Sequence, residues 1–263
     1  LIDARILSQE PIGVEALQPF GYDVFKSRDA SLSSPSSGPV PPDYVLGPGD
    51  SIRVQLFGNV NGIYEYEVSR EGVLHLPEIG PVTVAGLPFS EFRTDLNKRV
   101  QEMLIGTQVS VTMGQLRTMR VYVLGDVNRP GSVVVSGLET MTGALYHGGG
   151  VSSIGSLRNI QLKRNGKVVS SLDAYDLLIR GDTSGNSRLQ PGDVIFVPPI
   201  GKTVSISGAV NRPAIYEVKR LTTAADLIGL AGGLTPEAYA KGARLQRIDE
   251  SGERTILSVN LNN

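Results

Sequence analysis

The stretch VYVLGDVNRPGSVVV at residues 121–135 returns at residues 204–218 as VSISGAVNRPAIYEV, and this recurrence decides how the chain is organised. Residues 121–164 align with residues 204–247 without a gap, at an offset of 83 (204 minus 121). Each copy begins with alternating β-branched residues, turns at Asn-Arg-Pro, resumes an extended run and reaches a Gly-Gly pair. The recurrence predicts two copies of one unit: strand, turn, strand, short helix, strand and hairpin.

Composition limits the chain to a few classes of protein. Its 263 residues, 40% of them hydrophobic, are enough to build the cores of two or three domains. With 31 Gly, 16 Pro and no Trp, the sequence favours many turns and short strands, and we expect an α+β fold with helix as the minority state. The formal net charge of -1 gives no electrostatic reason to expect a nucleic-acid partner. The absence of Cys excludes disulfides and thiol catalysis in this chain.

Changes in composition divide the chain into five segments. An N-terminal packing segment carries the aromatic anchors Phe20, Tyr22 and Phe25, and a connector rich in Ser and Pro follows it. A first folded domain and the two repeats come next, and the second repeat stops before its last motif, so we expect it to be truncated. The expected boundaries are 1–26, 27–42, 43–118, 119–200 and 201–263. No run of about 18 apolar residues is present to span a bilayer as a helix, and the first ten residues lack the pattern of a signal peptide.

The first folded domain is expected to contain a small sheet. Residues 52–56 alternate apolar and polar side chains, as in a half-buried strand. Residues 70–72 predict a hairpin connection into a strand over residues 73–76. The two prolines within residues 77–81 are expected to break the chain there.

The clearest helix of the sequence lies over residues 90–104. Phe92 and Val100 fall on one face at helical spacing. Ser90 is expected to cap the N-terminus of this helix, and Gly106 to end it.

A second recurrence links the first folded domain with the first repeat. The sequence LGPGDSIRV at residues 46–54 is similar to LQPGDVIFV at residues 189–197. Pro followed by Gly presets a tight turn into a strand, and Asp accepts hydrogen bonds from nearby backbone N–H groups. We expect a structural role for both copies.

These motifs resemble the outer-membrane polysaccharide (capsule) export family. Residues 44–87, with YVLGPGDSIRVQLFG and REGVLHLPEIGPVTVAG, together with the predicted helix after them, resemble its polysaccharide export domain. In the first repeat, GDVNRPGSV, GGGVSSIGSLRNIQLKRNG and LQPGDVIFVP resemble its soluble-ligand-binding β-grasp (SLBB) domains, and the second repeat resembles a further one. The sequence QPFGYDVF before the connector matches longer members with several such units. The resemblance covers Asp43 to Asn263.

The resemblance implies a noncatalytic protein of the periplasm, associated with the outer membrane, whose domains stack as rings around a conduit for capsule or exopolysaccharide. The implied partners are the polysaccharide, further copies of the chain, and inner-membrane export or synthesis proteins; no cofactor is implied. A periplasmic carbohydrate-binding or scaffold protein that docks onto the same machinery is the open alternative. Whether this protein itself forms the outer-membrane pore is also open.

Six residues are candidate contacts to a ligand or to a neighbouring subunit. They are Asn128, Arg129, Asn211, Arg212, Tyr64 and Tyr66. The first four lie in the two Asn-Arg-Pro turns, where their side chains suit a sugar, although Asn and Pro equally serve a turn. For the two arginines, a neighbouring subunit is as good a candidate partner as a sugar. The two tyrosines alternate on one strand, where their rings stack on a sugar or pack within the sheet.

The sequence shows no grouping of residues that predicts catalysis. His75 lies in a strand pattern and His147 precedes a glycine run, and a structural or surface role is the simpler interpretation of both. The run Gly148–Gly150 lacks the Lys and Ser/Thr of a P-loop and is interpreted as the stop of a short helix. No carboxylate pair is placed by its spacing at the separation found in glycosidases. We therefore assign no catalytic, cofactor-binding or metal-binding residue.

Overall fold

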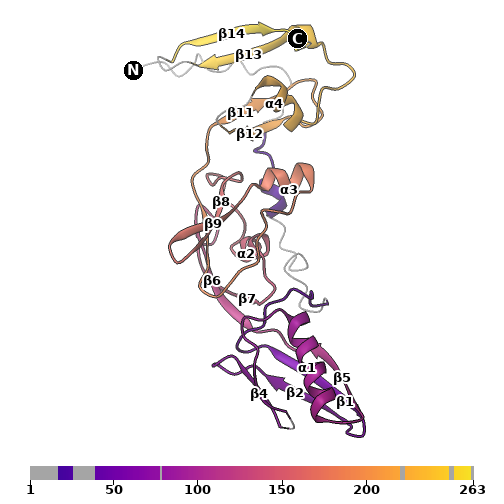
Figure 1. Ribbon diagram of the computed structural model, residues 1–263. Coiled ribbons are helices and arrows are strands. Elements are labelled where there is room, and N and C mark those ends of the chain that lie inside the picture. Colours follow the sequence, from indigo (N-terminus) through magenta and orange to yellow (C-terminus); the bar gives the residue numbers. More distant parts are fainter. Residues whose placement is uncertain (1–16, 26–38, 78, 220–222, 249–251, 262–263) are drawn as a thin grey trace.

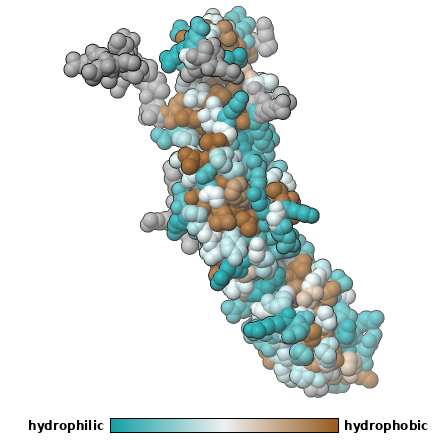
Figure 2. Space-filling view, turned by 90° about the vertical axis from the view of Figure 1, so that its left-hand side faces the viewer, coloured by the Kyte–Doolittle hydropathy of each residue, from teal (hydrophilic) through white to brown (hydrophobic). Residues whose placement is uncertain are grey.

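The chain folds into an elongated row of α+β units (Figure 1). The structure, a computed structural model, describes residues 17–25, 39–77, 79–219, 223–248 and 252–261. The domain around β1 and α1 lies at one end of the row, the first repeat in the middle, and the second repeat at the other end. Figure 2, turned by 90°, shows the same elongated outline with apolar patches between polar surface along its length. The predicted α+β class is confirmed.

The first domain combines a three-stranded sheet, a two-stranded sheet and one helix. Its elements are β1 (Ser51–Gly58), β2 (Gly62–Glu67), β3 (Val73–Leu76), β4 (Gly80–Thr83), α1 (Phe89–Met103) and β5 (Thr107–Met113). The three long strands are antiparallel and lie in the order β2-β1-β5. The predicted alternation over residues 52–56 is confirmed, since the apolar residues of β1 share one buried core with Phe92, Leu96 and Val100 of α1.

Helix α1 begins before Ser90, and Ser90 does not cap it, contrary to the prediction. The N-cap residue is Pro88, and no side chain makes a capping hydrogen bond there. Instead, the backbone N–H groups of Phe89 and Ser90 donate to the carbonyl oxygens of Tyr44 and Pro42, at 2.7 and 3.0 Å. The chain that leaves the connector therefore supplies the acceptors that the first turn of the helix needs.

The strand pairing in the second half of this domain also differs from the prediction. Among the described strands, β3 pairs with β4 and not with β2. The expected hairpin at residues 70–72 therefore joins strands of two different sheets. The expected break at residues 77–81 is itself the connection of a hairpin, whose second strand starts at Gly80. Pro81 is tolerated in β4 because an edge strand does not need every backbone N–H group.

The first repeat forms one five-stranded sheet with two short helices. Its elements are β6 (Thr118–Gly125), β7 (Gly131–Ser136), α2 (Met141–His147), β8 (Ile160–Arg164), β9 (Lys167–Leu172), α3 (Ala174–Arg180) and β10 (Val194–Val197). The predicted order of strand, turn, strand, helix, strand and hairpin is confirmed, and Asn165 and Gly166 form the hairpin turn with φ values of 50° and 77°. The sheet order is β7-β6-β10-β8-β9, so β10 is the central strand, parallel to β6 and antiparallel to β8.

The second repeat has matching elements but, in the part that the structure describes, no central strand. Its elements are β11 (Thr203–Ile206), β12 (Ala214–Glu217), α4 (Ala224–Leu230), a 3-10 helix (Ala240–Gly242), β13 (Ala243–Ile248) and β14 (Arg254–Val259). Strands β11 and β12 pair with each other, as do β13 and β14, and the two pairs form separate sheets. Of the residues expected to turn the last hairpin, Ser251 lies outside the described residues.

The N-terminal segment lies against both repeats. The N–H of Phe20 donates to the carbonyl of Ile215 in β12 at 2.9 Å, and the hydroxyl of Tyr22 donates to the carbonyl of Gly155 at 2.6 Å. Tyr22 and Phe25 are buried in a core that also contains residues of both repeats. The aromatic anchors thus join the two repeats into one core. The rest of this segment and most of the Ser- and Pro-rich connector lie outside the described residues.

Candidate functional site

The first Asn-Arg-Pro turn closes the C-terminal end of the short helix in its own repeat. The side-chain amide of Asn128 donates to the carbonyl of Gly149 at 2.8 Å, and its backbone N–H donates to the carbonyl of Gly150 at 3.0 Å. The N–H of Arg129 donates to the carbonyl of Gly148 at 2.9 Å. The glycine run therefore ends α2, as expected, and the turn satisfies its carbonyl groups.

The second turn makes the same three hydrogen bonds, 83 residues later. The amide of Asn211 donates to the carbonyl of Gly232 at 2.8 Å, and its N–H donates to that of Gly233 at 3.1 Å. The N–H of Arg212 donates to the carbonyl of Ala231 at 2.8 Å. The Ala that follows this turn, where the first turn has Gly, leaves these bonds in place. Both Asn side chains thus serve their own turn, and a role in ligand binding stays a prediction.

The two arginines of these turns have different surroundings. Arg129 is exposed, and its side chain has no hydrogen bond or ion pair with the described residues; a Cβ atom on Gly149 would lie 2.8 Å from its Nε. Arg212 is half-buried, donates from Nη2 to the carbonyl of Leu230 at 3.2 Å, and lies 5.8 Å from the ring centroid of Phe20. Arg129 is therefore free to contact another molecule, whereas Arg212 helps to hold the N-terminal segment.

The tyrosine pair lies on β2, at the edge of the first domain's sheet. The two rings are stacked, with centroids 6.0 Å apart and an interplanar angle of 21°. Tyr64 lies opposite Val54 and Tyr66 opposite Ile52, so both rings share the core face of the sheet. Tyr66 packs against the core, while Tyr64 remains 40% exposed. The pair thus combines packing within the sheet with an exposed ring of the kind that stacks on sugars.

Each Pro-Gly-Asp turn contains a fully buried Asp that binds an Arg, a contact that sequence spacing does not reveal. Asp193 accepts two hydrogen bonds of 2.8 Å from Nε and Nη2 of Arg164, and a third of 2.8 Å from the N–H of Gln190. The bond with this carboxylate raises the pKa of the Arg164 guanidinium. Asp50 binds the side chain of Arg117 in the first domain. Both aspartates have the structural role that was expected.

Glu217 connects the two repeats from a buried position. Its carboxylate accepts hydrogen bonds from Oγ of Ser156 at 2.7 Å, from the N–H of Leu157 at 3.0 Å and from the N–H of Gly201 at 2.9 Å. Its backbone N–H donates to the hydroxyl oxygen of Tyr175 at 3.0 Å. Burial raises the pKa of the Tyr175 hydroxyl to about 12. A residue of the second repeat is thus fixed to the first by several buried hydrogen bonds.

A second junction connects the first domain with the first repeat. Asp50 accepts hydrogen bonds from the N–H of Arg117 at 2.9 Å and from the hydroxyl of Tyr44 at 2.7 Å. Burial raises the pKa of the Tyr44 hydroxyl, and the hydrogen bond to Asp50 raises it further. Gly137 of the first repeat approaches Tyr44 so closely that a Cβ atom would lie 2.5 Å from the hydroxyl, and Leu138 packs on the core of the first domain. The row of units is therefore held by side-chain contacts as well as by the chain itself.

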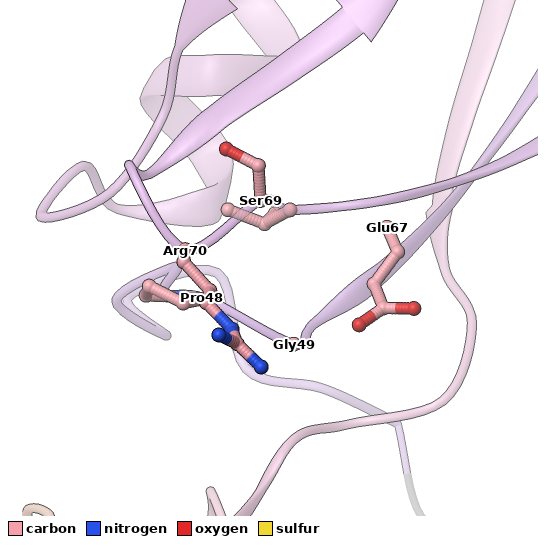
Figure 3. Close-up of a pocket in the computed structure, with 6 residues that line it drawn as sticks. Pro48, Gly49, Glu67, Ser69 and Arg70 are labelled. Atoms are coloured by element: carbon pink, nitrogen blue, oxygen red, sulfur yellow. The ribbon is translucent and has the colours of Figure 1, made fainter.

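The surface beside the first Pro-Gly-Asp turn contains an open pocket (Figure 3). It is lined by Pro48, Gly49, Glu67, Val68, Ser69 and Arg70. In Figure 3 the side chains of Arg70 and Glu67 lie on either side of Gly49. Glu67 is the one carboxylate among these lining residues, whereas glycoside hydrolysis generally uses a pair. The pocket offers polar contacts to a ligand but not that pair.

The histidines lie apart from any cluster of metal ligands. His75 is exposed on β3, and Nε2 of His147 lies 3.4 Å from Oε2 of the buried Glu139. Within the described ranges, no three His, Cys, Asp or Glu side chains come together as a metal site. Among the described residues, no helix is both long and apolar enough to cross a membrane.

Three known domain families match consecutive parts of the chain. The family described as "Polysaccharide biosynthesis/export protein" matches residues 38–114. Two further families are both described as "SLBB domain"; one matches residues 119–197 and the other residues 203–257. The matches follow the order of the first domain and the two repeats, and SLBB domains are β-grasp-like.

Several curated proteins have related sequences. The polysialic acid transport protein KpsD of Escherichia coli is 34% identical over 202 residues, which are 76% of this chain and 36% of that protein. The EPS I polysaccharide export outer membrane protein EpsA of Ralstonia nicotianae is 29% identical over 192 residues, which are 72% of this chain and 50% of that protein. The capsule polysaccharide export outer membrane protein CtrA of Neisseria meningitidis is 26% identical over 195 residues, which are 74% of this chain and 49% of that protein. The chain thus spans between 36% and 50% of the length of these relatives. It belongs to the polysaccharide biosynthesis/export family and carries two SLBB domains after its export domain.

Proposed function

We propose that this chain is a noncatalytic, periplasmic part of a conduit that exports capsule or exopolysaccharide across the bacterial outer membrane. One observation carries this proposal: the chain matches an export domain followed by two SLBB domains, and its relatives are named for polysaccharide transport and outer-membrane export. The polysaccharide is the proposed cargo. Further copies of the chain, assembled as rings, and inner-membrane export or synthesis proteins are the proposed partners.

The two buried junctions support an architectural role. Glu217 fixes the second repeat to the first, while Gly137 and Leu138 of the first repeat lie against Tyr44 and the core of the export domain. Units that are fixed in a row keep a constant spacing, which is what stacked rings require of each subunit.

Arg129 is the candidate subunit contact that the geometry favours, because its side chain is exposed. We expect Arg129→Glu in the full-length protein to reduce the ring population without lowering the melting temperature. Arg180→Glu is the matched control, since Arg180 lies exposed on α3 and pairs with Asp176 of the same helix. If Arg129→Glu assembles normally, Arg129 is not part of the subunit interface. Whether the protein forms rings is then decided separately, by measuring its mass. Asn128, Asn211 and Arg212 make hydrogen bonds within their own repeats, and a contact to a ligand or a neighbouring subunit stays a prediction for them.

The test of the function is the oligomeric state of the full-length protein together with its effect on secretion. We expect light scattering in detergent to give a multiple of the subunit mass, and electron microscopy to show rings. Deletion of the gene is expected to stop the polysaccharide from reaching the cell surface. A strict monomer whose loss leaves secretion intact would contradict the proposal.

A periplasmic carbohydrate-binding or scaffold protein is the second candidate, and the exposed ring of Tyr64 favours it. In that case a monomer binds oligosaccharide saturably in calorimetry, and Tyr64→Ala weakens binding by about 1 kcal/mol because a stacking contact is lost. Tyr122→Ala is the control, because Tyr122 is an equally exposed tyrosine on β6. Equal effects of the two substitutions would speak against a sugar site at Tyr64.

A further inference from the structure

A groove runs through the second repeat between its two small sheets. It is bounded by β11, α4 and β13, and its apolar lining includes Val204, Ile206, Leu227, Ile228, Leu234 and Leu245. In the first repeat the corresponding space holds β10, whose Ile195 and Val197 are fully buried. In Figure 1 the pair of β13 and β14 lies beyond the pair of β11 and β12, at the end of the row.

Side chains that are buried in the first repeat are open in the second. Helix α2 buries Met141, Ala144 and Leu145, whereas α4 buries none of its residues. Leu162 of β8 is 1% exposed, and Leu245 at the same position of β13 is 38% exposed. The contrast is expected if the groove is an unfilled strand position, because a strand there covers the helix and both neighbouring strands.

The backbone of β11 also points to this position. In the first repeat, the N–H groups of Tyr122 and Asp126 donate to carbonyls at the two ends of β10, at 2.9 Å each. The offset of 83 places Ser205 and Ala209 at the equivalent positions. Ile215, opposite Ser205 on β12, uses its own N–H and C=O for the N-terminal segment. Ser205 and Ile215 are therefore a non-hydrogen-bonded pair, whose N–H and C=O groups point away from each other. Those of Ser205 point to the free edge of β11, on the side of the groove.

A positive charge lies on β13, two residues beyond Leu245 of the groove lining. In the first repeat, Arg164 binds Asp193 immediately before β10 through two hydrogen bonds. The equivalent residue of the second repeat is Arg247 on β13, which is exposed and, in the described part of the chain, has no carboxylate partner. A strand that begins with Pro-Gly-Asp brings a carboxylate to this guanidinium, in the geometry that favours a bidentate pair.

We propose that this groove binds one further polypeptide strand, parallel to β11 and antiparallel to β13, which begins with a Pro-Gly-Asp turn whose Asp binds Arg247. Alternate residues of that strand are apolar and face α4, as Ile195 and Val197 face the core of the first repeat. Main-chain bonds to a free sheet edge give the affinity, and the apolar residues with the Asp give the specificity. The site is a peptide-binding site and does not depend on the proposed role in polysaccharide export.

The probe is a synthetic peptide with the sequence LQPGDVIFV of residues 189–197, added to the 263-residue chain. We expect saturable binding by fluorescence anisotropy and slower hydrogen exchange at the amides of Ser205 and Ala209. A peptide with Asn in place of Asp, or the variant Arg247→Ala, is expected to bind about tenfold or more weakly, because a hydrogen-bonded charge pair is lost. Arg254→Ala is the matched control, as Arg254 is likewise exposed but lies on the neighbouring strand β14, and it leaves binding unchanged.

Three outcomes overturn the proposal. The first is the absence of saturable binding at millimolar peptide. The second is binding that neither the Asp→Asn peptide nor Arg247→Ala weakens and that does not slow hydrogen exchange at the amide of Ser205. Such binding is apolar adsorption. The third is concentration-dependent dimerisation that excludes the peptide and is indifferent to Arg247, which assigns the groove to a second copy of the chain in another pairing.

Discussion

Replacing Glu217 by Ala tests how strongly the buried junction holds the second repeat on the first. The substitution removes the acceptor of three hydrogen bonds, from Ser156, Leu157 and Gly201. Ser156 and Leu157 are 1% and 0% exposed, so their donors are left without water, at a cost of about 1–3 kcal/mol each. Gly201 is exposed, and water replaces its bond at little cost. The expected loss in the free energy of unfolding is therefore about 2–6 kcal/mol.

Urea denaturation followed by circular dichroism and by amide exchange measures this loss. We expect the second repeat of Glu217→Ala to unfold at lower urea than the first, so that the two transitions separate. Glu217→Gln keeps the shape and one acceptor oxygen and should lie between wild type and Ala. Glu237→Ala removes an exposed carboxylate of the same repeat and should change the unfolding free energy by no more than about 0.5 kcal/mol. If Glu217→Ala stays within that range, the reasoning about the junction is refuted.

Three further changes probe other contacts. Arg164→Ala strands the buried carboxylate of Asp193 and should lower the unfolding free energy in urea by about 3 kcal/mol; a loss below about 1 kcal/mol contradicts this. Gly150→Ala and Gly166→Ala both place a methyl group at positive φ, but only the methyl group at residue 150 would meet a side chain of the N-terminal segment, 2.5 Å away. Calorimetry should therefore show the larger drop in melting temperature for Gly150→Ala. Equal drops for the two variants would contradict this. The pKa of Tyr175 is raised from 10.0 to about 12, because the folded state favours the neutral hydroxyl. The contribution of Tyr175 to the free energy of unfolding is therefore fully present below pH 10, and it falls by up to about 1.4 kcal/mol per pH unit as the pH rises toward 12. Tyr175→Phe should flatten this part of the alkaline unfolding curve, and an unchanged slope argues against the assignment.

Local chemistry in the sequence was sufficient for the local elements. Asn165 and Gly166 tolerate positive φ and predicted the hairpin correctly, and the spacing of apolar residues placed α1 to within one residue at each end. The repeat alignment predicted the unit that both copies share, including the glycine stop of α2. In each case, residues close together in sequence determine the conformation.

Contacts between distant segments were beyond such reasoning. Ser90 is a good capping residue, but the first two N–H groups of the helix donate to the carbonyls of Tyr44 and Pro42, which lie where the connector meets the first domain. The place of β10 in the middle of its sheet, and the pairing of Asp193 with Arg164, likewise depend on which strands become neighbours. No local period in the sequence encodes that choice.

The candidate contact residues show the same division. Turn chemistry predicted one role for Asn128 and Asn211, and their amides do bind the carbonyls of the glycine runs. The difference between Arg129 and Arg212 arises because Phe20, from the far end of the chain, lies beside the second turn and not the first. Identical motifs can thus differ in availability through a segment that neither motif contains.

The pairing of Phe20 with Ile215 also sets an order of events during synthesis. The segment that carries Phe20 leaves the ribosome before its partner on β12, which follows 195 residues later (215 minus 20). Until then Tyr22 and Phe25 have no complete core to enter, and exposed aromatic residues favour aggregation. The core shared by the two repeats therefore cannot close before β12 has been made.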